Sequence, residues 1–507
     1  MRMGKTMVKG GLLLLCLTLV GSQLTAFDFS SVENKITDFT LDNGMKFIVL
    51  EDRSAPVVSF VLLADVGASD DPKGYGGLAH VFEHLAFKGT EEIGTTNFKA
   101  ESKALEKLDM AYNEFRAEEK KGQFADSALL AQLKARFEKA QEASDSLVAM
   151  NEYPVIVDRE GGVGLNAGTG YDQTSYYCSY PSNKVELWFA MESQRFRKPV
   201  MRQFYKERDV IMEERRSLVE SSPIGRMLED FLGASYLVHP YGDALGGHMS
   251  DLRNIDKPTA NAFFNKYYVA SNLMVGIVGD VDPAQIRTLA EKYFGMLPKA
   301  PEPDRVLTVE PQQAAERRVI IPDKSQPYLL MGYHRPAGTD PDDPVYNALA
   351  DYLGQGRTSL LYTSLVKQKK LATNVSAFGS FPGSKYACQF GVFVAPAKGI
   401  SAAECETETL AQIERLKNEL IPNEDLDKIK ARAKAAFVEQ LSSRIGMAQT
   451  LTLYQNFYGD WHQLFRSLDK INAITPEDMQ RVAKACLTSG NYTVAYIVTT
   501  DEQTGGK

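Results

Sequence analysis

Apolar and polar residues along the first part of the chain follow two periods, one typical of strands and one typical of helices. Lys46–Leu50 and Pro56–Val66 are rich in apolar and β-branched residues on either side of a turn, which predicts two strands. Helical periodicity predicts helices over Leu78–Phe87, Val185–Phe196 and Phe204–Val219. Because strands and helices alternate irregularly and consecutive strands follow short turns, the pattern indicates an α+β fold with largely antiparallel sheets covered by helices.

One pattern occurs twice. Ile255–Gly279 (IDKPTANAFFNKYYVASNLMVGIVG) and Ile474–Val498 (ITPEDMQRVAKACLTSGNYTVAYIV) each have a proline-containing helix start, an amphipathic helix, a turn at an asparagine and an alternating strand. The asparagine follows the first isoleucine by 17 positions in both segments, at Asn272 (272 − 255) and at Asn491 (491 − 474). We therefore predict two homologous domains.

A proline-rich segment separates the two repeats. Leu297–Arg318 (LPKAPEPDRVLTVEPQQAAERR) has four prolines in its first fifteen positions, and proline disrupts helix interiors and central strands. We predict an extended linker over residues 297–318, a first domain over 27–296 and a second domain over 319–507.

One segment of the first domain departs from this plan. Ala100–Ala149 is rich in Ala, Glu, Lys and Gln, with apolar positions at helical spacing on both sides of a break at Gly122–Phe124. The pattern predicts a helical hairpin, inserted at about residues 100–160, with one apolar stripe on each helix. Two roles remain open for it: a solvated arm packed on itself, or an element that docks a partner or gates a site.

The first residues have the composition of an export signal. A basic start precedes an apolar run over Gly11–Gly21, and Leu24–Ala26 resembles a cleavage site. The run is too short for a membrane span, so we predict a signal peptide over residues 1–26 and a periplasmic or secreted protein. A lipid anchor on Cys16 is the alternative.

The charge of the chain narrows the classes of partner. The formal charge is −8, and removal of the signal, with its three basic and no acidic residues, leaves 54 − 65 = −11. No basic tract is present, which argues against nucleic acid as a partner. No later segment is apolar enough to span a membrane, so we predict no transmembrane anchor in the mature chain.

Four cysteines remain after the predicted cleavage: Cys178, Cys388, Cys405 and Cys486. They show no C-x-x-C spacing, so a structural zinc knot is not expected. An oxidising compartment would permit a Cys388–Cys405 disulfide, and buried free thiols are the alternative.

Two histidines and a glutamate lie close together on the helix predicted over Leu78–Phe87. His80 and His84 are one turn apart and about 40° apart around the axis, so both imidazoles reach one metal ion. Glu83 lies about 60° to the other side of His80 and borders the open position as a base. Such a site lowers the pKa of a bound water toward ~7 and polarises a carbonyl. The alternative is a helix with two surface or capped histidines, against which the H-x-x-E-H spacing argues.

A third protein ligand has to come from another element. Lys206–Glu220 (KERDVIMEERRSLVE) offers Glu207 and Glu214, which are seven positions apart and project from one face of a helix. One carboxylate would bind the metal and the other would orient a ligand or the water. Glu213 is a rival that spacing does not exclude. An exposed charged helix held by its own arginines is the structural alternative.

These segments together resemble the insulinase/pitrilysin family of inverted zinc metallopeptidases, which includes mitochondrial processing peptidase and similar bacterial members. Gly77–Thr90 (GLAHVFEHLAFKGT) is similar to the family's zinc helix and its exit. Leu165–Tyr177 (LNAGTGYDQTSYY) resembles its substrate-binding edge strand, and Glu207–Glu214 (ERDVIMEE) resembles its third-ligand helix. Further similar segments extend the resemblance over nearly the whole mature chain.

The resemblance implies a zinc (Zn²⁺) endopeptidase that cleaves extended peptides. It assigns His80, His84 and Glu214 as the three zinc ligands. Glu83 would be the catalytic base, and Glu207 would be a supporting acid. Asn166 and Ala167 would pair with the peptide substrate as an added strand. Phe87 would line a side-chain pocket or pack in the core. In the family the domains enclose a chamber, which limits substrates to peptides and unfolded segments.

Two departures from the family's pattern bear on function. His84 and Glu214 are 130 positions apart (214 − 84), more than is usual in the family, and the predicted hairpin accounts for the excess. Many relatives carry an Arg and a Tyr in the second half that hold the substrate backbone, whereas Lys367 and Thr373 stand at the matching places here. Either the pair has drifted, or the chain forms a homo- or heterodimer with a related subunit that supplies it.

Two other function classes remain open. A chain that kept the fold without catalysis would be an assembly or peptide-binding subunit, against which the intact His80, Glu83 and His84 argue. A zinc hydrolase on an unrelated fold would cleave a non-peptide substrate and leave peptides intact.

Overall fold

The computed structural model describes residues 29–500, so the predicted signal peptide and Cys16 lie outside the described residues. Within residues 29–500, no helix combines the length and the apolar composition that a membrane crossing requires.

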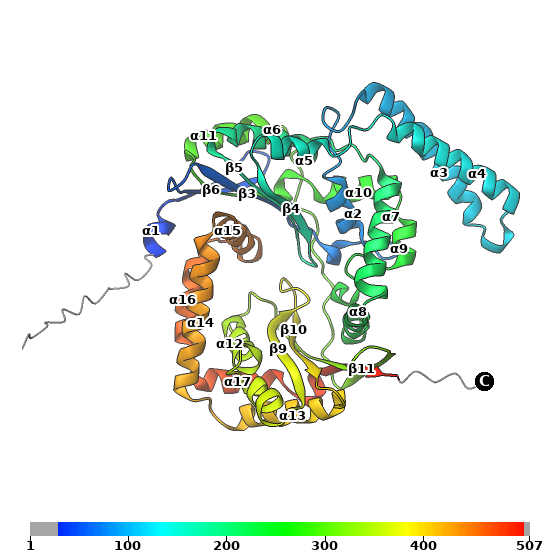
Figure 1. Ribbon diagram of the computed structural model, residues 1–507. Coiled ribbons are helices and arrows are strands. Elements are labelled where there is room, and N and C mark those ends of the chain that lie inside the picture. Colours follow the sequence, from blue (N-terminus) through cyan, green and yellow to red (C-terminus); the bar gives the residue numbers. More distant parts are fainter. Residues whose placement is uncertain (1–28, 501–507) are drawn as a thin grey trace, which may run out of the picture.

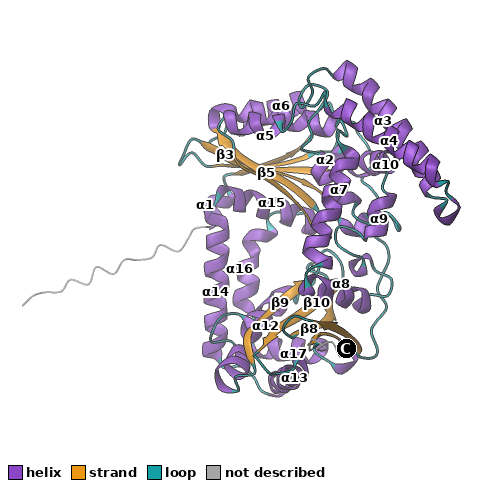
Figure 2. Ribbon diagram, turned by 45° about the vertical axis from the view of Figure 1, so that its right-hand side comes forward, coloured by secondary structure: helices purple, strands orange, loops and turns teal. Residues whose placement is uncertain are grey.

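The first half of the chain is built on a six-stranded sheet (Figures 1 and 2). Its order is β1-β2-β6-β3-β5-β4, with β2 and β6 parallel and the other neighbours antiparallel. The strands are β1 (Ile36–Thr40), β2 (Lys46–Glu51), β3 (Val57–Ala64), β4 (Val163–Thr169), β5 (Thr174–Pro181) and β6 (Leu273–Gly279). The central strands β3 and β6 are buried at nearly every position, because helices cover both faces of the sheet.

The second half repeats this topology on a five-stranded sheet. Its order is β7-β11-β8-β10-β9, with β7 and β11 parallel and the other neighbours antiparallel. The strands are β7 (Arg317–Asp323), β8 (Tyr328–Arg335), β9 (Ala372–Phe381), β10 (Cys388–Pro396) and β11 (Tyr492–Thr499). Without β1, the first sheet has the same order, which confirms the predicted α+β fold in two related halves.

The two asparagines that the sequence pairs by spacing have the same structural role. Asn272 Nδ2 donates to the carbonyl of Tyr267, five residues earlier, and to Asp65 O after β3. Asn491 Nδ2 donates to the carbonyl of Cys486, also five residues earlier, and to His334 O in β8. Each asparagine therefore joins the end of a helix to the strand beside it.

Each half has its own helical layer. In the first half it contains α2 (Leu78–Leu85), α5 (Glu152–Arg159), α6 (Val185–Arg197), α7 (Phe204–Arg215), α9 (Met249–Asn254), α10 (Lys257–Tyr267) and α11 (Pro283–Tyr293). In the second half it contains α12 (Asp343–Gly354), α13 (Ala402–Asn418), α14 (Asn423–Ser442) and α17 (Pro476–Cys486). Helix α16 (Gln463–Ala473) contacts α12 and α14, and its Leu464 is buried in the cluster under the first sheet. The short α1 (Phe29–Glu33) contacts α16.

The halves exchange one helix each. Helix α8 (Pro223–Ser235) of the first half packs on the second sheet, and α15 (Arg444–Tyr458) of the second half packs under the first sheet (Figure 1). Glycines allow the close approach: a Cβ at Gly276 of β6 would lie 2.7 Å from Ala448 O, and a Cβ at Gly332 of β8 would lie 2.5 Å from the Phe231 ring. Each sheet therefore needs the other half to cover one of its faces.

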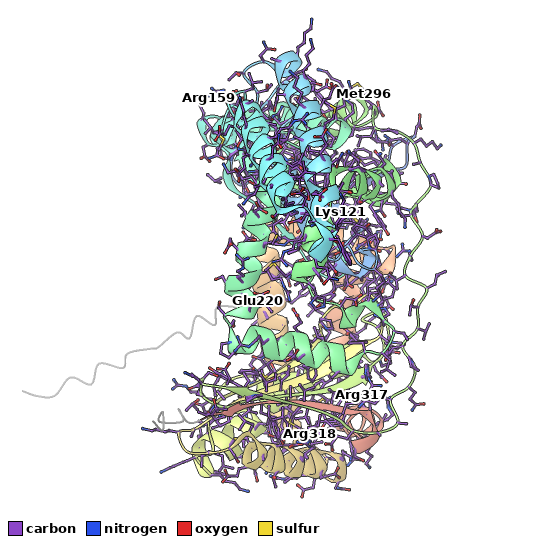
Figure 3. The ribbon with its side chains drawn as sticks, turned by 90° about the vertical axis from the view of Figure 1, so that its right-hand side faces the viewer. Lys121, Arg159, Glu220, Met296, Arg317 and Arg318 are labelled. Atoms are coloured by element: carbon purple, nitrogen blue, oxygen red, sulfur yellow. The ribbon has the colours of Figure 1, made fainter. Side chains whose placement is uncertain are left out.

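The proline-rich linker is extended. Figure 3 shows the segment from Met296 to Arg317 along one side of the molecule, and residues 298–314 are neither helix nor strand. The Glu310 carboxylate holds it to the first half by accepting hydrogen bonds from three consecutive backbone N–H groups, at 2.7–3.1 Å, in residues 237–239. Strand β7 begins at Arg317, two residues before the predicted second domain.

The predicted hairpin is confirmed and projects from the first half (Figure 1). We call it the arm, and it consists of α3 (Phe98–Glu119) and α4 (Ser127–Asp145). The side chains of Asn97 and Asp126 cap the two helix starts by accepting backbone N–H groups. Phe124, in the turn between the helices, is 80% exposed.

All four cysteines in the described residues are free and buried, so the structure places no disulfide between Cys388 and Cys405. Cys388 Sγ lies 3.8 Å from Pro336 O, whereas Cys405 Sγ lies 3.4 Å from Leu371 O. Burial raises the pKa of both thiols to about 11, which keeps them protonated and unreactive at neutral pH.

Candidate metal centre

The helix that carries the paired histidines begins at a glycine. Gly77 has φ +96°, and a Cβ there would lie 2.5 Å from Gly246 O, so only glycine fits. The Asp71 carboxylate accepts hydrogen bonds from the backbone N–H groups of Gly77 (2.6 Å) and Ala79 (2.9 Å), which have no partner inside the helix. The apolar face of α2 packs in the core, which turns both histidines outward.

The structure brings His80, His84 and Glu214 together. Their ligand atoms all lie within 4.8 Å of one another. Glu214 Oε2 is 3.8 Å from His80 Nε2 and 3.6 Å from His84 Nε2, and the two imidazole rings are perpendicular with centroids 4.9 Å apart. Two imidazoles and one carboxylate form a donor set typical of a catalytic zinc site.

Glu213, which spacing could not exclude, points elsewhere. Its side chain is 67% exposed and pairs with Arg216, in the π-helical turn that follows α7. Consecutive residues on a helix differ by about 100° around the axis, so Glu213 and Glu214 face different surroundings.

The neighbouring helix fixes the end of α7, where Glu214 lies. The sequence predicted one continuous helix over Phe204–Val219. In the structure the α-helix ends at Arg215, and a π-helical turn, Arg216–Glu220, follows it. Arg215 donates two hydrogen bonds, of 2.9 and 2.8 Å, to the Glu229 carboxylate of α8. His248 Nδ1 lies 3.2 Å from the same carboxylate. This bidentate pair holds the third carboxylate at the paired histidines.

Glu207 contacts His84 from the other side, as a supporting acid would. Its Oε2 lies 3.5 Å from His84 Nδ1, and its Oε1 pairs with Lys88. Burial raises the pKa of Glu207, but hydrogen bonds with His84 and Lys88 outweigh burial and lower its pKa below the ordinary value. An ionised Glu207 would fix the orientation of the His84 ring.

The two histidines differ in their pKa. Burial lowers the pKa of His80 to about 4, and the neighbouring His84 adds to the shift, so His80 is neutral at pH 7. Burial also lowers the pKa of His84, but the hydrogen bond with Glu207 and the charges of Glu214 and Glu83 raise it above the ordinary value overall. A neutral imidazole is the form that binds a metal.

Glu83 lies beside the histidine pair and receives one hydrogen bond that the sequence analysis missed. Thr169 Oγ1, at the end of β4, donates to Glu83 Oε2 at 2.6 Å. Thr174 Oγ1 in turn lies 3.4 Å from Thr169 Oγ1. Thr169 follows Asn166 and Ala167 on the predicted edge strand, but nothing in the sequence shows that this strand contacts helix α2.

Strand β4 is the edge of the first sheet, as predicted for the substrate-binding strand. Asn166 pairs with Tyr177 and Ala167 with Tyr176 on β5. The Ala167 N–H donates to Asn166 Oδ1 at 2.9 Å rather than to β5. This N–H therefore faces the open edge, where an added strand would meet it.

Phe87 lies between the core and the surface. It is partly buried against the first core, and its ring contacts those of Tyr153 and Tyr176. The fully buried Arg195 guanidinium lies 5.1 Å from the Phe87 ring centroid. Both roles expected for Phe87 are compatible with this position.

Lys367 and Thr373 lie in the second half. Lys367 Nζ is 5.9 Å from the Tyr362 ring of its own π-helical turn, Tyr362–Gln368. Thr373 Oγ1 donates to Ala395 O of the adjacent strand β10 at 3.2 Å. Both therefore make contacts within their own domain.

Comparison with known proteins agrees with this geometry. The family model described as insulinase (peptidase family M16) matches residues 46–121, which contain the H-x-x-E-H segment, and the model described as the peptidase M16 inactive domain matches residues 254–433. The chain belongs to the insulinase, or M16, family of peptidases.

Relatives of this M16 chain include named proteases. It is 27% identical over 420 residues to the zinc protease PqqE of Helicobacter pylori, covering 81% of each chain. It is 21% identical over 473 residues to a probable mitochondrial-processing peptidase subunit beta of Arabidopsis thaliana, covering 90% of this chain and 76% of that one. The crystal structure of a protease from Helicobacter pylori superposes with a TM-score of 0.76 at 25% identity and covers 92% of this chain and 99% of that one.

Proposed function

We propose that this M16 peptidase is a zinc-dependent endopeptidase. The observation that carries the proposal is the convergence of His80, His84 and Glu214 within 4.8 Å, although Glu214 is 130 positions from His84 (214 − 84). The naming of relatives as zinc proteases supports it. His80, His84 and Glu214 would hold the ion, and Glu207 would orient His84.

The chain's own residues would carry out the proton transfers. Glu83 would accept a proton from the water that attacks the scissile carbonyl and would return it to the leaving amine. The hydrogen bond from Thr169 would hold the Glu83 carboxylate in place for both steps. When bound, zinc supplies polarisation of the peptide carbonyl and acidification of the water.

The edge strand suggests extended peptides or unfolded segments as substrates. The outward Ala167 N–H offers main-chain pairing that does not depend on the side chains of the peptide. We propose that the two halves enclose the substrate in a chamber, which would exclude folded proteins. Phe87 would then contact a substrate side chain.

We further propose a related partner subunit and an exported location. Lys367 and Thr373 replace the Arg/Tyr pair of many relatives, and the Arabidopsis relative is named as a subunit. The second candidate function, an assembly or peptide-binding subunit without catalysis, rests on the same replacement. Peptidase assays and size-exclusion chromatography of the chain, alone and with a co-expressed relative, separate the two. The N-terminal sequence supports export to the periplasm or beyond, which cell fractionation tests.

Two substitutions test the site. Glu83→Gln should keep one zinc per chain and lose peptide cleavage, because the amide cannot accept the proton. Glu214→Gln should lose zinc and activity together. The measurements are metal analysis of purified protein and hydrolysis of a quenched fluorescent peptide. Full turnover by Glu83→Gln, or full zinc content in Glu214→Gln, would overturn the corresponding assignment.

A further inference from the structure

The middle of the arm contacts the helix that carries Glu207 and Glu214. The rings of Tyr112 on α3 and Tyr205 on α7 stack with centroids 3.9 Å apart, and each residue is only 3% exposed. Arg208 Nη1 donates to Tyr112 Oη at 2.5 Å, and Tyr205 Oη donates to Asp109 Oδ1 at 3.0 Å. Stacking and hydrogen bonds therefore join α3 to one side of α7.

The second helix of the arm completes this cluster. The Phe137 ring of α4 lies 5.4 Å from the Tyr112 ring and 5.5 Å from the Tyr205 ring. We call Tyr112, Phe137, Tyr205 and Arg208 the arm–α7 cluster. It combines residues of both arm helices with two residues of α7.

A buried ion pair ties the start of the arm to both metal-site helices. Arg202 and Glu101 are completely buried and share two hydrogen bonds, of 2.6 and 3.0 Å. The other Arg202 N–H groups donate to the carbonyls of Lys88 (2.8 Å), Thr90 (2.6 Å) and Ile93 (3.1 Å) in the loop that leaves α2. Arg202 thus joins the arm, the exit of α2 and the residues just before α7.

Helix α7 is therefore held between two elements. Tyr205 and Arg208 are three positions apart and face the arm, whereas Glu207 and Glu214 are seven positions apart and face α2. If α7 moves as one body, a change on the arm side would displace the carboxylates on the other side. Toward the tip, Arg116 in the last turn of α3 donates to Arg253 O (3.1 Å) and Asn254 Oδ1 (3.3 Å), at the end of α9, whereas Phe124 in the turn between the arm helices is 80% exposed.

We propose that the inserted arm is a positioning element for the metal site, in which the arm–α7 cluster and the Arg202–Glu101 pair set the distance between the third carboxylate and the paired histidines. This inference rests on the proposed zinc site. It assigns the metal-site role to the start and middle of the arm and none to the turn at Phe124.

The test compares the same substitution in the middle and at the tip of the arm. Phe137→Ala removes a ring from the arm–α7 cluster, and Phe124→Ala removes a ring from the exposed tip. Zinc affinity is measured by competition with a chromophoric chelator, alongside kcat and KM for a peptide and thermal unfolding of the metal-free protein. Loss of groups that support a metal ligand typically weakens metal binding about 10- to 100-fold.

The expected result is a zinc affinity at least about tenfold weaker and a lower kcat for Phe137→Ala, at a temperature where the metal-free variant is folded. KM should stay unchanged because β4 is untouched, and Phe124→Ala should match wild type. A folded Phe137→Ala with wild-type zinc affinity would overturn the inference, as would an equal loss in Phe124→Ala.

A second pair of variants covers the case in which Phe137→Ala does not fold. Tyr112→Phe keeps the stacked ring but loses the oxygen that accepts from Arg208, and Asp109→Asn weakens the contact with Tyr205. Each should weaken zinc binding in the folded protein, by less than Phe137→Ala; wild-type affinity in both would overturn the inference. A wild-type chain that binds no zinc would instead overturn the proposed function, on which this inference depends.

Discussion

Thr169 places a hydroxyl against the carboxylate proposed as the catalytic base. Its Oγ1 lies 2.6 Å from Glu83 Oε2 and does not belong to the set of ligand atoms. A hydrogen bond to a charged group contributes about 1.5–3 kcal/mol, roughly a tenfold effect or more on a rate if the bond holds the base in place.

Thr169→Val should therefore lower kcat about tenfold or more and leave the zinc content at the wild-type level. Thr169→Ser, which keeps the hydroxyl, should restore most of the rate. Steady-state kinetics measures kcat of both variants, and metal analysis measures their zinc content. If valine and serine at this position give the same kcat, the hydrogen bond does not orient Glu83.

The ion pair behind Glu214 gives the protein a pH dependence. Burial raises the pKa of Glu229, but hydrogen bonds with His248 and Arg215 lower it overall to about 2, from an ordinary value of 4.5. A folded-state pKa below the unfolded value stabilises the fold above about pH 4.5, and this stability is lost as the pH falls toward 2.

We expect Glu229→Gln to be less stable than wild type at pH 7 by on the order of 2 kcal/mol, and the difference should shrink at pH 3.5. Urea unfolding at the two pH values, followed by circular dichroism, measures the free energies. A difference that grows on acidification would contradict the assignment of the low pKa to Glu229.

At the scale of elements, the edge strand β4 brings two functions together. It ends at Thr169, beside the base, and it presents the Ala167 N–H at the open side of the sheet. The same strand would thus align the peptide and hold the group that cleaves it.

Ala167→Pro removes that N–H, and proline is tolerated on an edge strand. We expect KM for a peptide to rise about tenfold, because the loss of one hydrogen bond to the substrate costs roughly 1–1.5 kcal/mol, with zinc content unchanged. Asn166→Ala, which uncovers the N–H without removing it, is the control and should not raise KM. An unchanged KM in Ala167→Pro would mean that the peptide binds elsewhere.

At the scale of the whole molecule, the exchanged helices make the two halves interdependent. Phe231 of α8 is fully buried in a cluster with residues of β7, β8 and β11, and Leu451 of α15 is fully buried in a cluster with residues of β2, β3 and β6. Neither sheet buries both faces with its own half alone.

Phe231→Ala should destabilise the protein by about 3–5 kcal/mol, since it removes a buried ring and leaves a cavity. Because each half needs the other, both should unfold in one transition at a lower temperature. Differential scanning calorimetry measures this, with Phe124→Ala at the arm tip as the control. Two separate transitions, of which only one shifts, would show that the halves fold independently.

The sequence by itself determined several helices and strands and the part of the site that lies on α2. Periodicity predicted strands β2 and β3 and helices α2 and α6 to within about two residues, because these depend on local burial. Helical spacing put His80, His84 and Glu83 together for the same reason. The equal distances to Asn272 and Asn491 predicted the repeat, because the same hydrogen bonds require the same local spacing.

Tertiary structure decided everything that depends on contacts between distant segments. Spacing left Glu213 as a rival of Glu214, and only the resemblance to the family favoured Glu214. The packing of α7 between α2 and the arm places Glu214, not Glu213, beside the paired histidines. The Thr169–Glu83 hydrogen bond and the exchange of α8 and α15 likewise join segments that are far apart in the sequence. No local sequence pattern predicts such contacts. Local periodicity reports which face of an element is buried, but only the folded chain decides which other element buries it.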